Sequence, residues 1–93
     1  MTAGEAREQL PAVPEWTLAE DAASISRTLN TGDFVTAVGH INRIGDLAEA
    51  EQHHPNLHLT GYRHLKIVLT THAIGGLSAN DFILAAKIDE AIA

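Results

Sequence analysis

The chain has 93 residues, which is enough for one domain with a modest core, so self-association is an expected source of further stability. Twelve acidic residues against six basic ones give a net charge of −6 at pH 7. This charge argues against a nucleic-acid partner, because phosphate backbones are bound by clustered Lys and Arg. The chain has no cysteine, no apolar run that approaches the ~20 residues of a membrane span, and no apolar signal-peptide core at its start. We therefore expect a single domain over residues 1–93 that is cytoplasmic, with no membrane partner.

The sequence of the N-terminal third predicts a short helical segment followed by a β-hairpin. Residues 4–10 are expected to form a short helix, which the prolines that follow would end. Residues 15–19, around Trp16, and residues 24–29 resemble strands, and apolar and polar residues alternate in the second. Because the link between them is short, the two strands are expected to pair in antiparallel orientation.

The middle of the chain predicts a long helix and a second hairpin. A polar corner at residues 30–33 offers caps for a helix over Phe34 to Gln52, which carries an apolar stripe with helical spacing. Residues 57–60 and 64–71 then form the second hairpin candidate, with alternating apolar side chains in its second strand.

The last predicted element is a helix over residues 79–92, whose start has a capping signal. Ser78 is the expected N-cap, and Asp81 is placed at N3 to reach back to it, as in a capping box with a shorter acid. Leu77 and Phe82 stand at the two positions of a hydrophobic staple. The resulting order, β-β-α-β-β-α after a short N-terminal helix, predicts an α+β fold with a four-stranded antiparallel sheet and helices packed on one face.

Three histidines form the strongest functional signal. His53 and His54 stand directly before Pro55, and His72 follows the end of a strand-like segment. Because proline disfavours the helical conformation in the residue before it, we expect His53 to end the helix and His54 to leave it. Imidazoles suit acid-base catalysis, since their ordinary pKa of about 6.5 makes both protonation states accessible at neutral pH.

Two carboxylates accompany these histidines in the sequence. Glu49 precedes His53 by one helical turn, where it is expected to orient the imidazole or raise its basicity; a solvated surface role is the alternative. Asp81 is either a helix cap alone or a supporting group of the site.

The ordered set of these residues resembles the pterin-4a-carbinolamine dehydratases. The signature of that family is an acid, three residues, His-His-Pro, an aromatic residue, a histidine and an aspartate, which here are Glu49, His53-His54-Pro55, Tyr62, His72 and Asp81. The likeness covers about residues 16–92. The chain departs from the usual family pattern at Leu29, Thr31 and His40, which affects packing more than chemistry.

The resemblance implies a dehydratase that converts 4a-hydroxytetrahydropterin to quinonoid dihydropterin and water, which recycles the pterin after an aromatic amino acid hydroxylase has used it. It implies His53, His54 and His72 as catalytic residues, with His53 and His72 as the expected acid-base pair and His54 orienting or binding the pterin. No metal or other cofactor is expected. The residues expected to contact the substrate are His53, His54, Pro55, Thr71, His72, Ala73 and Ile74, supported by Glu49 and Asp81.

Assembly is expected to involve the long helix. Gly39 and Gly45 weaken a helix by ~1 kcal/mol each relative to Ala, but they let another helix approach closely. This agrees with the homo-oligomer, expected to be a tetramer, that the resemblance implies.

Other interpretations of the sequence give weaker expectations. A catalytically silent oligomeric binding or assembly protein of the same fold would not need the histidines. A metal site built from His53, His54, His58 and His72 is disfavoured, because adjacent histidines rarely converge on one ion. We expect His58 and His64 on the surface and Trp16 as a packing anchor. Tyr62 is expected in the hairpin core, and stacking on the ring of the substrate is the alternative.

Overall fold

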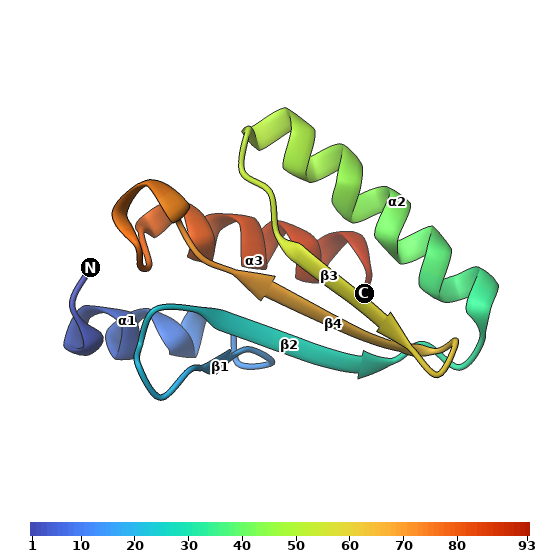
Figure 1. Ribbon diagram of the computed structural model, residues 1–93, viewed down its shortest axis with the longest axis horizontal. Coiled ribbons are helices and arrows are strands. Elements are labelled where there is room, and N and C mark those ends of the chain that lie inside the picture. Colours follow the sequence, from blue (N-terminus) through green and yellow to red (C-terminus); the bar gives the residue numbers. More distant parts are fainter.

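A computed structural model describes residues 1–93 and confirms the predicted α+β class and element order. The elements are α1 (Ala3–Gln9), η1 (Leu10–Ala12), β1 (Thr17–Leu18), β2 (Ile25–Asn30), α2 (Phe34–Glu51), β3 (Asn56–Thr60), β4 (His64–Leu69), η2 (His72–Ile74) and α3 (Ala79–Ala91). The strands form one antiparallel sheet in the order β1-β2-β4-β3. α2 and α3 lie on the same side of this sheet and leave its other side open (Figure 1).

The strand register separates an apolar face from a polar face. In β4, one of the two central strands, Leu65, Ile67 and Leu69 are buried, whereas His64 and Lys66 at the alternate positions are exposed. Successive side chains of a strand point to opposite faces, so this alternation places the buried residues under the helices. The exposed positions of His64 and of His58 in β3 agree with the surface positions predicted for them.

The core joins this face of the sheet to the helices. Ile44 of α2 and Leu84 and Ile88 of α3 are fully buried in the same cluster as the β4 side chains. Burial of an Ile or Leu side chain contributes about 1.5–3 kcal/mol, so these contacts fix both helices on the sheet. Trp16 is also buried in this cluster, as predicted.

A polar contact ties the first strand region to α3. Oδ1 of Asp89 accepts a hydrogen bond from Trp16 Nε1 at 2.8 Å and from the Arg27 guanidinium at 2.6 Å. These three residues come from segments far apart in the sequence, so one carboxylate links the lead-in, β2 and α3.

α2 ends close to the expected position, but His53 does not end it as expected. The helix ends at Glu51, and Gln52 adopts a left-handed conformation with φ of 53°. The Gln52 N–H donates to the carbonyls of Ala48 and Glu49, and the His53 N–H donates to Ala48 at 3.1 Å. A left-handed residue after a helix satisfies the last carbonyls and redirects the chain, so the chain has already left the helix before His53.

The hairpin regions differ from the prediction in detail. β1 comprises only two residues, and β4 ends at Leu69, after which Thr71 pairs with Gly76 in an isolated bridge. The prediction of Tyr62 in the core was also wrong: its side chain is 57% exposed, and its φ of 57° lies in the left-handed region. The tight turn between β3 and β4 requires this backbone conformation, and it turns the ring outward, where the Arg63 guanidinium lies 5.5 Å from the ring centroid.

None of the three α-helices combines the length and the apolar character that crossing a membrane requires.

Candidate active site

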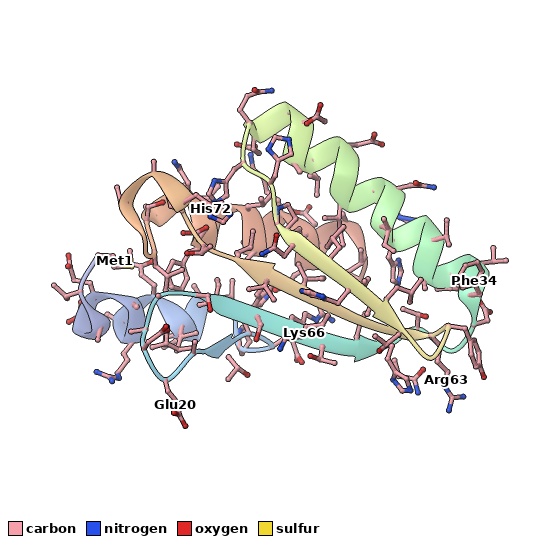
Figure 2. All side chains as sticks on the ribbon, in the orientation of Figure 1. Met1, Glu20, Phe34, Arg63, Lys66 and His72 are labelled. Atoms are coloured by element: carbon pink, nitrogen blue, oxygen red, sulfur yellow. The ribbon has the colours of Figure 1, made fainter.

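The predicted site residues come from four chain segments that meet at one end of the molecule. These segments are the C-terminal end of α2, the residues before β3, the η2 turn after β4, and the start of α3. Figure 2 shows His72 at this end, far from Phe34 and Arg63 at the opposite end.

His53 is held by a buried carboxylate. Its Nε2 lies 2.5 Å from Oδ1 of Asp81, and the Asp81 side chain is fully buried, whereas 15% of the His53 side chain is exposed. An isolated buried carboxylate is costly unless donors surround it. Asp81 therefore needs partners, and His53 is one of them.

The second oxygen of Asp81 has two further donors. Oδ2 accepts from Thr71 Oγ1 at 2.8 Å and from the backbone N–H of Ser78 at 2.9 Å. The Ser78 contact confirms the predicted capping box at the start of α3. Asp81 is thus both a helix cap and the partner of His53, so the two alternatives considered for it are compatible.

The expected contact between Glu49 and His53 was wrong. A carboxylate oxygen of Glu49 pairs instead with Nε2 of His54. The left-handed residue Gln52 ends the helical spacing, so a contact based on one helical turn no longer applies at position 53. The pair is open to solvent, with 73% of the Glu49 side chain and 61% of the His54 side chain exposed. An exposed pair of this kind contributes about 0–1 kcal/mol.

The remaining predicted contact residues border the same region. His72, Ala73 and Ile74 form the exposed η2 turn, whereas Pro55 is half-buried before β3. His72 directly follows Thr71, whose hydroxyl contacts the carboxylate that holds His53. A short path of contacts therefore connects His53 with the backbone that carries His72.

The one cavity in the structure lies beside the histidines and not among them. It has a volume of about 470 Å³ and is lined by Met1, Ala3, Asp21, Ala22, Ala23, Ile74, Gly75, Gly76 and Leu77. Ile74 alone belongs to the predicted site, so the geometry of the imidazoles, and not this cavity, defines the candidate site.

No group of three or more His, Cys, Asp or Glu side chains is arranged to hold a metal ion. The polar groups brought together at the site are imidazoles, carboxylates and hydroxyls.

One contact of this arrangement was not predicted. Ser78 was predicted only as a helix cap, yet its Oγ lies 2.7 Å from Thr71 Oγ1. The sequence holds a partial signal, because a Thr next to a candidate catalytic His precedes a capped helix with an acid at N3. Thr71 and Ser78 are only seven positions apart, but their contact depends on the η2 turn between them.

Comparison with known proteins places the chain in a family. Residues 1–91 match the family model described as pterin 4 alpha carbinolamine dehydratase. The chain is 46% identical over 92 residues to pterin-4-alpha-carbinolamine dehydratase 2, mitochondrial, of Arabidopsis thaliana, covering 97% of this chain and 49% of that protein. It is also 46% identical over 85 residues to a protein of Halorhodospira halophila that carries the same family name, covering 91% of this chain and 77% of that protein. The chain thus spans about half the length of the first relative and about three quarters of the second.

Two solved structures share the fold. A transcriptional coactivator/pterin dehydratase from Brucella melitensis superposes with a TM-score of 0.92 at 28% identity, over 100% of this chain and 98% of that one. A pterin dehydratase-like protein, described as a RuBisCO assembly factor in the alpha-carboxysome, has a TM-score of 0.70 at 16% identity, over 84% of this chain and 89% of that one. At that identity the second likeness concerns the fold alone.

The fold and the site together define a small α+β protein with an imidazole-carboxylate centre at one end of its sheet. The chain belongs to the pterin-4-alpha-carbinolamine dehydratase family, as predicted, and the relatives bear the name of a hydro-lyase.

Proposed function

We propose that this protein removes water from a 4a-hydroxytetrahydropterin to give quinonoid dihydropterin, with His53 and His72 as the acid-base pair. The observation that carries this proposal is the contact of 2.5 Å between His53 and the fully buried Asp81. Because histidine supplies the commonest general acid or base in enzymes, a histidine fixed by a buried carboxylate at the edge of the structure is suited to proton transfer.

The reaction needs two proton transfers and no change of oxidation state. One proton leaves the ring nitrogen N5 and one is delivered to the departing hydroxyl at C4a, while the N5–C4a double bond forms and water is released. Each transfer from a positioned group contributes ~10²–10⁴-fold. Two imidazoles, one acting as base and one as acid, are sufficient for this task.

The other predicted residues have supporting roles in the proposal. His54, which Glu49 orients, binds or orients the pterin from the exposed corner after α2. Pro55, Thr71, Ala73 and Ile74 border the pterin together with the histidines. Their position before β3 and along the η2 turn supports this placement.

A catalytically silent binding or assembly protein of the same fold is the alternative function. Such a protein would not need a histidine held by a buried carboxylate, and exposed histidines without partners would serve it equally well. The three donors around Asp81 therefore favour the enzyme.

Dehydration of synthetic 4a-hydroxytetrahydropterin tests the proposal directly. The wild-type protein is expected to accelerate the reaction, and His53→Ala is expected to lose ~10²-fold or more of kcat. His64→Ala, an exposed histidine on the open face of the sheet, is the matched control and should keep its activity. A wild-type rate equal to that of buffer would contradict the proposal.

The setting of this activity is also proposed. We place the protein in the cytoplasm as a homo-oligomer, expected to be a tetramer, in which α2 contributes to an interface. An aromatic amino acid hydroxylase would supply its substrate, because that class of enzyme forms the 4a-hydroxypterin.

A further inference from the structure

Thr71 uses all of its polar groups within the chain. Its N–H donates to the Gly76 carbonyl at 2.8 Å, and its own carbonyl accepts from the N–H groups of Ile74 and Gly76 at 3.2 and 3.4 Å. Its hydroxyl lies between Asp81 Oδ2 and Ser78 Oγ, at 2.8 and 2.7 Å. The hydroxyl of Thr71 is therefore engaged by the Asp81 carboxylate and by Ser78.

The directions of these hydrogen bonds follow from counting protons. A threonine hydroxyl has one proton, and a carboxylate only accepts hydrogen bonds. Thr71 therefore donates to Asp81 Oδ2, and the Ser78 hydroxyl donates to Thr71 Oγ1. Together with the Ser78 N–H, which also donates to Oδ2, two donors occupy one oxygen of Asp81 and leave Oδ1 for His53.

We infer that Thr71 and Ser78 are positioning residues that hold Asp81 as an acceptor, so that His53 carries its proton on Nε2 and presents an unprotonated Nδ1 to the pterin as the base. The inference that His53 is the base rests on the function proposed above. The other tautomer would place the lone pair of Nε2 against the lone pairs of Oδ1 at 2.5 Å, which is repulsive. The contacts of Asp81 thus select one of the two nitrogens for catalysis.

With this tautomer, His53 is the base of the elimination. Nδ1 of His53 takes the proton from N5, the electrons of that bond form the N5–C4a double bond, and the C4a–O bond breaks. The leaving hydroxyl takes a proton from a second group, His72 in the proposed function, and departs as water. The imidazolium formed at His53 lies beside the Asp81 carboxylate, as in the histidine-aspartate pair of serine hydrolases, and then releases its proton to solvent.

The tautomer of His53 can be measured without any assay of activity. ¹⁵N-labelled wild-type protein, studied by NMR above the ordinary titration range of imidazole, is expected to show His53 with the proton on Nε2. The His53→Gln variant assigns the signals. A proton on Nδ1 would overturn the inference, whatever the protein catalyses. Conversely, absence of dehydratase activity would contradict the proposed function and leave the tautomer result valid.

Substitution of Thr71 tests its positioning role. Thr71→Val removes the hydroxyl at nearly constant volume and is expected to lower kcat by about tenfold or more, with a mixed tautomer signal at His53. Thr71→Ser keeps the hydroxyl and is expected to have the wild-type kcat and the wild-type tautomer signal at His53. Unchanged kcat and an unchanged tautomer in a folded Thr71→Val protein would overturn the role. If Thr71→Val does not fold, Ser78→Ala is used in its place, because it removes the hydroxyl that donates to Thr71 and is expected to weaken the same signals.

Discussion

His53 and Asp81 are 28 residues apart in the chain, yet Nε2 of the first lies 2.5 Å from Oδ1 of the second. Two local features bring them together. The left-handed conformation of Gln52 turns the chain away from α2 just before His53. The capping box at the start of α3 fixes Asp81 at N3, inside the structure. Elements that each form for local reasons therefore create the long-range contact at the centre of the site.

Asp81→Asn is expected to impair both stability and turnover. An amide has one acceptor oxygen where the carboxylate has two, so either His53 or the pair of Thr71 and Ser78 loses its acceptor. We expect a loss of about 3 kcal/mol in the free energy of unfolding, measured by urea denaturation, and a loss of ~10²-fold in kcat. Asp46→Asn, an exposed carboxylate on α2, is the control. Wild-type stability in Asp81→Asn would show that these hydrogen bonds are not formed in solution.

Asp89→Ala is expected to destabilise the fold without touching the site. The change leaves both Arg27 and the Trp16 indole N–H without their acceptor. Because about a fifth to a quarter of the two charged side chains is exposed, water compensates in part, and we expect a loss of about 2 kcal/mol. The control is Glu51→Ala, which removes the more exposed contact with Lys87 and should cost below about 1 kcal/mol. Equal losses in the free energy of unfolding for the two variants would show that the contacts of Asp89 with Trp16 and Arg27 contribute no more than an exposed ion pair.

His40 is expected to make stability depend on pH. Burial lowers the pKa of His40, and the positive charges of Arg43 and Arg27 lower it further. The unfolded chain therefore takes up a proton before the folded protein does, so stability is complete above the ordinary pKa of about 6.5 and is lost as the pH falls below it.

His40→Leu is the test of that dependence. The Nδ1 atom of His40 is buried without a hydrogen-bond partner, so the change should raise stability by about 1 kcal/mol, with a larger gain below pH ~6.5. The free energy of unfolding is measured by urea denaturation across this range, with His58→Ala from the exposed side of β3 as control. A gain that stays constant with pH would exclude His40 as the titrating group.

Gly45 provides a test of the proposed interface on α2. A Cβ atom added there meets nothing within 4 Å inside the monomer, so Gly45→Ala is expected to stabilise the helix by about 1 kcal/mol. Gly45→Leu should be tolerated by the monomer but should keep a second helix at a distance. We expect light scattering to report a multiple of 9.9 kDa for the wild-type protein and a smaller mass for Gly45→Leu.

The control for Gly45→Leu is Ala50→Leu, because Ala50 is exposed and lies about 140° around the same helix. The Ala50→Leu variant should have the same mass in light scattering as the wild-type protein. A wild-type mass of one chain at micromolar concentration would refute the assembly proposal and would leave the site unaffected.

The parts of the fold that were predictable are those with local causes. The alternation in β4, the apolar stripe of α2 and the capping residues Ser78 and Asp81 each have a period or a spacing that the sequence displays. The family signature, as an ordered set and not a single motif, singled out all three histidines as candidates, and their catalytic roles stay a prediction.

The contacts that were not predictable depend on the backbone between elements. Helical spacing predicted a contact between Glu49 and His53. Because Gln52 adopts a left-handed conformation, Glu49 contacts His54 instead. Tyr62 was assigned to the core by its aromatic character, but the turn conformation exposes it. The partner of His53 required knowledge of how α3 lies against the end of β4, which no local pattern contains.

The proposed function depends most on the assignment of His53 and His72 as the acid-base pair, and one measurement tests this assignment most directly. We would follow dehydration of synthetic 4a-hydroxytetrahydropterin by the wild-type protein and by the double variant His53→Ala/His72→Ala, with circular dichroism to show that both are folded. We expect the folded double variant to lose at least ~10²-fold of kcat. A folded double variant that retains wild-type turnover would contradict the assignment of His53 and His72.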